Sequence, residues 1–353
     1  MRSAPAVGPD GRLYLHIEDK LLVLQEKDGQ PEVISDYVTG SRVPGPVVLA
    51  ADGTLRMHAM DGMLHALESA SGRQIWAPVE VGEPLGYAAP VVDAAGNTYI
   101  SAYDGGLLRV DPDGEVDRSR PFFRSRQRLN SAGVIYQGVL YIGSDDGYVF
   151  AVELGGERGK NRFDHVAEQG LTGWFINTAL AVGADGTIIV ASRDEHIYGF
   201  SPAGKTVFKT PVPGQMLGAP VLDARGNICV GVTILQRGRP AQGQLISIDG
   251  NSHKQRWQYH ADGSVESTPV IGDDGVIYFG DNAGMIHAVD DHGKLQWKAK
   301  VDQPVRSAGT IIGPQRVAFG LDDETLMVLN CSSSSLAPGV WPKFGRTLGQ
   351  SAT

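Results

Sequence analysis

Several features are scarce or missing in this chain of 353 residues, and each absence excludes a class of protein. The two cysteines, Cys229 and Cys331, could form one disulfide or none, but they are too few for a disulfide scaffold or a cysteine-rich zinc module. The 31 basic residues are outnumbered by 40 acidic ones, and the formal charge of −9 argues against nucleic acid as a partner. No apolar run approaches the roughly 18 residues of a membrane span, and no long segment has the period of a helix.

Glycine, by contrast, is in excess: 46 of 353 residues is about 13%, against roughly 7% in average proteins. A hydrophobic fraction of 42% with only 20% charged residues excludes disorder and supplies a sizeable core. Many of the glycines lie in tight turns such as Asp10-Gly11, Asp52-Gly53 and Asp274-Gly275. Alternating strands follow these turns, as at Thr98–Ser101, so the excess is explained by repeated β-hairpins.

A repeat of about 43 residues runs the length of the chain, which is the unit length of a four-stranded propeller blade. Each unit has a proline or its equivalent, an apolar strand, a tight turn and a second apolar strand. The anchor positions are Pro5, Pro46, Pro90, Gly133, Ala179, Pro220, Pro269 and Gly309. The sequence therefore predicts an all-β fold, one eight-bladed β-propeller of four-stranded antiparallel blades spanning residues 1–353.

The predicted repeats start near residues 3, 44, 88, 131, 177, 218, 267 and 307. We expect residues 336–353 to form a closing strand and tail. Within them, Trp341–Phe344 is the candidate for the outer strand of blade eight.

A second pattern points to a family. Ala66–Trp76 reads ALESASGRQIW, and weaker copies occur at Ser247–Trp257 and Ala288–Trp297. The pattern resembles the tryptophan-docking motif of quinoprotein-type propellers, in which an outer-strand tryptophan packs against the next blade. With the repeat period, it makes the chain similar to the pyrroloquinoline-quinone-like (PQQ-like) eight-bladed repeat family. That family includes quinoprotein alcohol dehydrogenases and outer-membrane assembly lipoproteins of the BamB type.

The resemblance also implies a location. Family members are mostly exported in bacteria, so we expect a periplasmic or secreted protein, with the cytoplasm as the alternative. The first residues, Met1–Pro5, do not form a signal peptide, and we expect a leader that was removed or not included.

Residues just before the eight anchors should gather at one mouth of the central funnel, because the inner strands of a propeller surround that funnel. The predicted ring contains Arg2, Arg42, Tyr87, Arg128, Asn130, Trp174, Phe175, Met216, Glu266 and Arg306. Arg306, Arg2 and Arg42 come from consecutive blades and should cluster, and guanidinium groups bind carboxylates in pairs of hydrogen bonds. The hypothesis is an anionic or carbohydrate ligand at this mouth. The alternatives are an internal ion pair between Glu266 and an arginine, or docking of a partner protein.

Three classes of function stay open. The preferred one is a non-catalytic binding or scaffold protein, expected to be a monomer, with its ligand or partner at the funnel mouth. The second is a lyase for acidic polysaccharides, with Tyr87 as base and Arg306 and Arg42 neutralising a uronate. The third is a PQQ-dependent dehydrogenase with PQQ and calcium, for which the resemblance implies adjacent cysteines. Cys229 and Cys331 are not adjacent, so we expect no cofactor.

No metal site is expected either. His65 and His287 occupy equivalent positions in non-adjacent blades, so they cannot share a metal, and we expect both to be packing residues. The segments Asp111–Gly114 and Ser144–Gly147 lack the bidentate glutamate of a calcium loop. No Gly-x-Ser-x-Gly elbow is present, so the sequence predicts no nucleophile.

Overall fold

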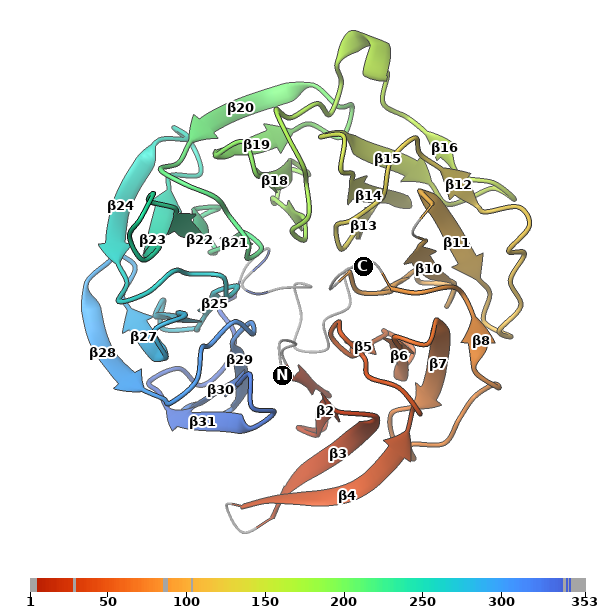
Figure 1. The fold of residues 1–353 in the computed structure, drawn as a ribbon, viewed down its shortest axis with the longest axis horizontal. Helices are drawn as coiled ribbons and strands as arrows, with labels where there is room; N and C mark the ends of the chain where they lie inside the picture. The colour runs from red at the N-terminus through yellow and green to blue at the C-terminus, as the bar shows by residue number, and fades with distance from the viewer. Residues whose placement is uncertain are drawn as a thin grey trace.

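The computed structural model describes residues 5–27, 30–84, 88–102, 104–338, 341 and 343. Eight antiparallel sheets are arranged in a ring, so the chain is an eight-bladed β-propeller (Figure 1). The prediction of an all-β fold with eight blades is confirmed. No helix in the described part of the chain is long and apolar enough to span a membrane.

Within each blade the strands follow the chain from the axis to the rim (Figure 1). Blades one and two contain β1 (Ala6–Val7), β2 (Leu13–Ile17), β3 (Lys20–Lys27), β4 (Gln30–Val38), β5 (Val48–Leu49), β6 (Thr54–His58), β7 (Met63–Glu68) and β8 (Val79–Glu80). Blades three and four contain β9 (Val91–Val92), β10 (Thr98–Ser101), β11 (Gly106–Val110), β12 (Phe123–Arg124), β13 (Val134–Tyr136), β14 (Val139–Gly143), β15 (Val149–Glu153) and β16 (Lys160–Asn161). Blades five and six contain β17 (Ala181–Val182), β18 (Ile188–Ser192), β19 (His196–Phe200), β20 (Thr206–Pro211), β21 (Val221–Leu222), β22 (Ile228–Ile234), β23 (Gln242–Ile248) and β24 (Gln255–His260). Blades seven and eight contain β25 (Val270–Ile271), β26 (Ile277–Gly280), β27 (Met285–Val289), β28 (Leu295–Lys300), β29 (Thr310–Gly313), β30 (Arg316–Gly320) and β31 (Leu326–Asn330).

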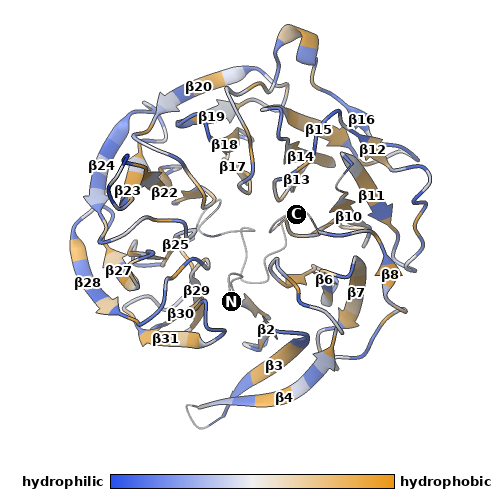
Figure 2. Cartoon of the chain, viewed as in Figure 1, coloured by the Kyte–Doolittle hydropathy of each residue, from blue (hydrophilic) through white to orange (hydrophobic). Residues whose placement is uncertain are grey.

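The core lies between blades. One hydrophobic cluster joins Tyr141 of blade four, Val190 of blade five and Val230 of blade six, all fully or almost fully buried. Every residue of β14 and of β18 is buried, whereas β24 and β28 carry exposed residues between half-buried ones. Figure 2 shows this as alternating bands of hydropathy along the outer strands. Because a blade buries its faces only against its neighbours, the ring is the unit that folds.

Two tryptophans, Trp257 of the outer strand β24 and Trp76 just before the outer strand β8, contact glycines of the following blade. Trp257 of β24 lies against Gly293 of blade seven, and its Nε1 donates a hydrogen bond to the Asp291 carbonyl at 2.8 Å. A Cβ on Gly293 would come within 2.7 Å of the indole, and one on Gly114 within 2.9 Å of Trp76. Both glycines have positive φ, +79° and +88°, so turn geometry and contact each require glycine.

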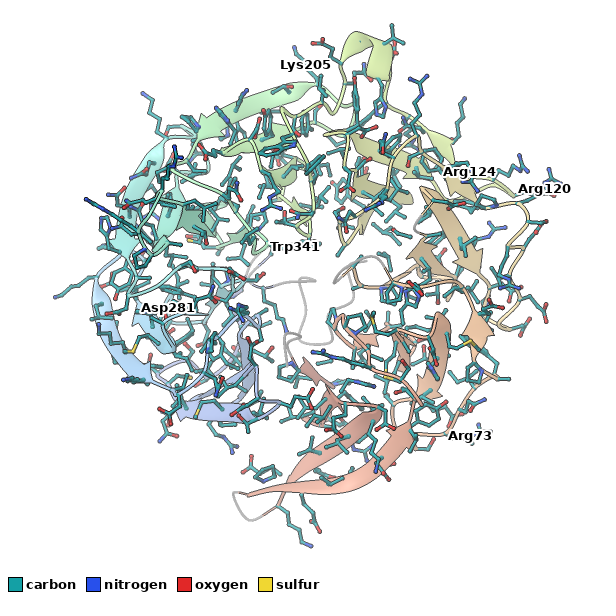
Figure 3. All side chains as sticks on the ribbon, in the orientation of Figure 1. Arg73, Arg120, Arg124, Lys205, Asp281 and Trp341 are labelled. Carbon is teal, nitrogen blue, oxygen red and sulfur yellow. The ribbon has the colours of Figure 1, made fainter. Side chains whose placement is uncertain are left out.

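The described residues near the C-terminus pair with inner strands of the ring. Leu336 bridges Gly272 of blade seven, and Trp341 bridges Leu222 of β21, whose N–H donates to the Trp341 carbonyl at 2.7 Å. Trp341 is buried at the inner side of the ring (Figure 3). The described part of residues 336–353 is therefore not the outer strand of blade eight that the sequence suggested. The sheet of that blade has three strands in the described residues.

The two cysteines are both free thiols. Cys229 is buried in β22, and burial raises its pKa to about 12, so this thiol is unreactive at neutral pH. Burial also raises the pKa of Cys331. The sequence had left one disulfide open, and the structure contains none between these residues.

Candidate functional site at one mouth of the ring

The predicted ring positions lie beside the turns between the second and third strands of the blades. The same backbone hydrogen bond recurs there: Met60 N–H to Arg42 carbonyl at 2.8 Å, Asp145 N–H to Arg128 carbonyl at 3.0 Å, and Arg193 N–H to Phe175 carbonyl at 3.0 Å. Repetition of this contact in blades two, four and five indicates that the entry loops and these turns form one mouth. Arg2 and Tyr87, which the sequence placed in the ring, lie outside the described residues.

One group of predicted residues comes together around the turn Ser144–Gly147 of blade four. The Asn130 side-chain amide donates to Asp145 Oδ1 at 3.2 Å, and the Asp145 N–H bonds the Arg128 carbonyl from the same side. The loop that carries Trp174 closes from the other side, with the Ile176 N–H donating to the Ser144 carbonyl at 3.2 Å. Arg128, Asn130 and Trp174 therefore flank one turn.

The aromatic pair on that loop is exposed although its backbone is fixed. Trp174 is 49% and Phe175 39% exposed, and their ring centroids lie 5.4 Å apart. The Trp174 carbonyl accepts hydrogen bonds from the hydroxyls of Thr172 at 2.8 Å and Ser192 at 3.2 Å. Rigid aromatic side chains on a fixed loop offer a large apolar contact area at low entropic cost, as at the centres of protein interfaces.

A second group forms around Arg306. Its Nε lies 3.3 Å from Glu266 Oε2, and its Nη1 forms an ion pair with Asp322. The Asn282 side-chain amide donates to the other Glu266 oxygen at 2.6 Å. One guanidinium is thus shared by two carboxylates, which is the internal pairing considered as an alternative. An anionic ligand at Arg306 would have to compete with both of them.

Blades two and six depart from the expected ring. Arg42 is exposed, beside Met60, which is itself 46% exposed. Met216 is fully buried in the core, so its placement at the mouth was wrong. The neighbouring Gln215 is half-buried, and its side-chain carbonyl accepts a hydrogen bond from Arg193 Nη2 of blade five at 2.8 Å.

Sequence reasoning missed a repeated aspartate at the mouth. Asp61, Asp104, Asp146, Asp281 and Asp323 each lie in a turn between second and third strands and accept hydrogen bonds from backbone N–H groups of that turn. This is ordinary turn chemistry. The Asp-Gly or Asp-x-x-Gly spacing at Asp61, Asp104, Asp146 and Asp281 was the available signal. Asp281 is fully buried and Asp104 is paired with Arg124, so these aspartates shape the turns and do not form a continuous acidic rim.

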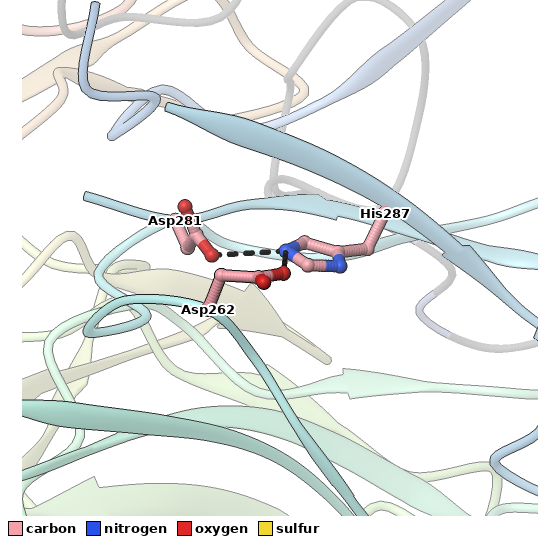
Figure 4. A group of neighbouring side chains, drawn as sticks. All are labelled: Asp262, Asp281 and His287. Carbon is pink, nitrogen blue, oxygen red and sulfur yellow. Dashed lines mark hydrogen bonds and ion pairs between the residues drawn. The ribbon is translucent and has the colours of Figure 1, made fainter. Parts of the chain in front are cut away.

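The two equivalent histidines are packing residues, as expected. His65 and His287 are buried, and each Nδ1 is hydrogen-bonded at 3.1 Å to a tyrosine of the preceding blade, Tyr37 and Tyr259. His287 Nε2 donates to Asp281 at 2.9 Å (Figure 4). Burial alone would raise the pKa of Asp281, but hydrogen bonds from His287 and backbone N–H groups outweigh it and lower that pKa.

Asp262, Asp281 and His287 could by distance hold a metal, but their atoms have other partners. Both Asp262 oxygens lie 2.8 Å from the Lys298 ammonium, and both Asp281 oxygens accept backbone N–H groups. Calcium prefers six to eight oxygen ligands, and this cluster offers few. Nor does Glu266 supply a free carboxylate. The oxygens of this cluster do not fit the coordination that calcium prefers.

Comparison with known proteins gives the following relationships. The profile of the family described as "Outer membrane protein assembly factor BamB" matches residues 1–175, 162–310 and 231–337. No curated protein has a matching sequence. The crystal structure of BamB from Moraxella catarrhalis is 15% identical, with a TM-score of 0.68 over 94% of this chain and 99% of that one.

Two further structures show how widely the fold is shared. The computationally designed protein Ika8 is 16% identical, with a TM-score of 0.71 over 94% of this chain and 97% of its own. Quinohemoprotein alcohol dehydrogenase from Comamonas testosteroni is 14% identical, with a TM-score of 0.70 over 91% of this chain and 70% of its own. A designed protein and an enzyme match about equally well, so these likenesses establish the fold alone.

Proposed function

Since the chain belongs to the family described as outer membrane protein assembly factor BamB, we propose that it is a non-catalytic scaffold that docks a protein partner at the mouth described above. Trp174 and Phe175 would be the anchor, with Arg128 and Asn130 on the adjoining turn. We also propose that it works as a monomer in the periplasm or outside the cell, as the family resemblance suggests.

The exposed aromatic pair is the observation that carries this proposal. Large apolar side chains exposed on a fixed loop cost free energy in water unless a partner covers them, and tryptophan is enriched among the residues that dominate binding. The acidic turns around the pair provide a polar rim, which is the usual surrounding of such an anchor.

The two catalytic alternatives receive less support. Of the two arginines that a lyase would use, Arg306 is held between Glu266 and Asp322 and would have to leave both carboxylates to neutralise a uronate. Arg42 is exposed, so only the pairing of Arg306 argues against a lyase. A quinone dehydrogenase would need calcium ligands, whereas the oxygens of Glu266 and Asp281 already accept hydrogen bonds.

The test is site-specific photo-crosslinking from position 174 in cells, with the crosslinked protein identified by mass spectrometry. We expect one partner to be captured, and Trp174→Ala to weaken its binding by at least about tenfold. His292, whose side chain is 77% exposed in a turn between third and fourth strands, is the matched control position. Equal capture from positions 174 and 292, or unchanged affinity in Trp174→Ala, would refute docking at the mouth.

A further inference from the structure

The rim of blade eight differs from the rims of the other seven blades. In the described residues its sheet ends at β31, whereas every other sheet has a fourth strand outside the third (Figure 1). Among the described C-terminal residues, Leu336 bridges Gly272, Trp341 bridges Leu222 and Lys343 bonds Thr310, so none of these three pairs with β31. Blade one follows directly, and Arg316 of blade eight forms an ion pair with Glu26 of β3 across the junction. One edge of β31 thus has no strand partner within the described part of the chain.

The third strands of complete blades show what β31 lacks. Ile286–Val289 of β27 and Leu245–Ile248 of β23 are entirely buried, while no residue of Leu326–Asn330 is. Val328 is 38% exposed, whereas Ala288, at the equivalent position of blade seven, is fully buried. The positions correspond because each lies two residues beyond the partner of the glycine that ends the second strand. Within the described residues, β31 therefore lacks the outer strand that covers the equivalent positions of blades six and seven.

Blade one extends the same apolar surface. In the pairing of β3 with β4, Leu24 lies opposite Val33 and Lys20 opposite Val38, so these side chains share a face. Val33 is 52% and Val38 55% exposed. The other face of β3 carries Leu21 and Val23, which are packed in the cluster shared with blade two. The exposed face is consequently the one turned toward blade eight.

We propose that this open edge is a docking site for one extended peptide segment, which joins β31 as the fourth strand of blade eight. The chain's own outer strands define the chemistry of that segment. β24 and β28 read QRWQYH and LQWKAK, with tryptophan at the third position, and Trp297 lies opposite Ala288. The third residue of the docked segment would lie opposite Val328. Such strand addition satisfies the backbone groups of the edge, and alternate side chains provide specificity.

Charge complementarity indicates which residues the segment carries at its C-terminal end. Lys300, the last residue of β28, lies opposite Met285, directly after the turn of blade seven. The corresponding turn of blade eight carries Asp323 and Glu324, so it favours a basic residue at the C-terminal end of the segment. The occupant is therefore an extended segment with a tryptophan in its first half and lysine or arginine in its second half.

The test uses a fluorescently labelled synthetic peptide of residues Gly293–Asp302, which contains the β28 sequence. We expect saturable binding at one site, and at least tenfold slower amide exchange in Leu326–Asn330 when the peptide is bound. Val328→Asp should weaken binding at least tenfold. Val207→Asp should not, because Val207 is similarly exposed on the edge strand β20 of a complete blade.

A peptide with serine in place of the tryptophan provides a control that does not depend on the folding of a variant, and it should bind at least tenfold more weakly. Equal protection of β20 and β24 would indicate general edge binding and overturn the proposal. So would a concentration-dependent dimer whose β31 is protected without peptide, since a second copy would then fill the edge. The proposed peptide site lies along β31 and meets the mouth only at the turn that carries Asp323, whereas Trp174 and Phe175 belong to blade five. The Trp174→Ala test of the proposed function and the Val328→Asp test of this site can therefore fail independently.

Discussion

Lys343 is the most unusual single residue of the ring, because a lysine side chain is fully buried at its inner side. Its described hydrogen-bond partner is the Thr310 hydroxyl at 3.2 Å, and burial lowers its pKa from 10.5 to about 7. A buried ammonium without a counter-ion costs stability. Burial of Lys343 therefore lowers the free energy of unfolding near neutral pH.

Replacing this lysine by methionine should stabilise the protein. We expect Lys343→Met to raise the free energy of unfolding at pH 7 by about 1–3 kcal/mol, measured by urea denaturation. The folded pKa is depressed, so the wild type gains stability as the pH rises from 7 toward 10.5, and the advantage of the variant should shrink over that range. Lys300→Met, at an exposed position, is the control and should change little. An advantage that stays constant with pH would contradict a buried, titrating amine.

At the residue scale the sequence predicted packing roles better than contacts. His65 and His287 were predicted to be packing residues because equivalent positions in non-adjacent blades cannot share a metal, and both are buried and hydrogen-bonded to a tyrosine of the preceding blade. The sequence could not predict that Arg306 forms ion pairs with both Glu266 and Asp322, because these pairs depend on the directions of side chains from two blades. Met216 was misplaced because the repeat spacing does not say which loop side chains are buried, and this one packs in the core.

At the scale of elements, the turn that contacts the outer strand of the preceding blade has two requirements. Its glycine must adopt a positive φ, and it must leave room for the tryptophan of that strand. Gly293 and Gly275 both have a φ of +79°, but only Gly293 faces an indole. A Cβ on Gly275 would find its nearest neighbour at 3.9 Å, the Asp291 Cβ. Alanine substitutions at Gly275 and Gly293 therefore distinguish the cost of backbone strain from the cost of losing the contact between blades.

We expect Gly275→Ala to lower the free energy of unfolding by about 1 kcal/mol, from backbone strain alone. Gly293→Ala should lower it by about 2–4 kcal/mol, because the Trp257 ring must also move. Urea unfolding of the two variants measures the difference. Equal losses would mean that the Trp257 contact contributes nothing to stability.

At the scale of the whole molecule, the number of blades was predictable because eight similar units repeat with a nearly constant period. The closure of the ring was not, since it depends on segments that occur once. Trp341 was expected at the rim of blade eight and lies instead on β21. The sequence predicted Trp174 and Phe175 as mouth residues, but only the structure shows that this aromatic pair is exposed and is not a core pair.

The central claim is that this mouth binds a protein and neither a quinone cofactor nor an acidic sugar. Thermal unfolding of the purified protein with PQQ plus calcium, and separately with uronate oligosaccharides, tests it most directly. We predict an unchanged Tm with each. A ligand present at 100 times its Kd adds about 2.7 kcal/mol, which for a chain of this length is a rise of about 3–5 °C. Such a rise with either ligand would contradict the claim and favour one of the two catalytic alternatives.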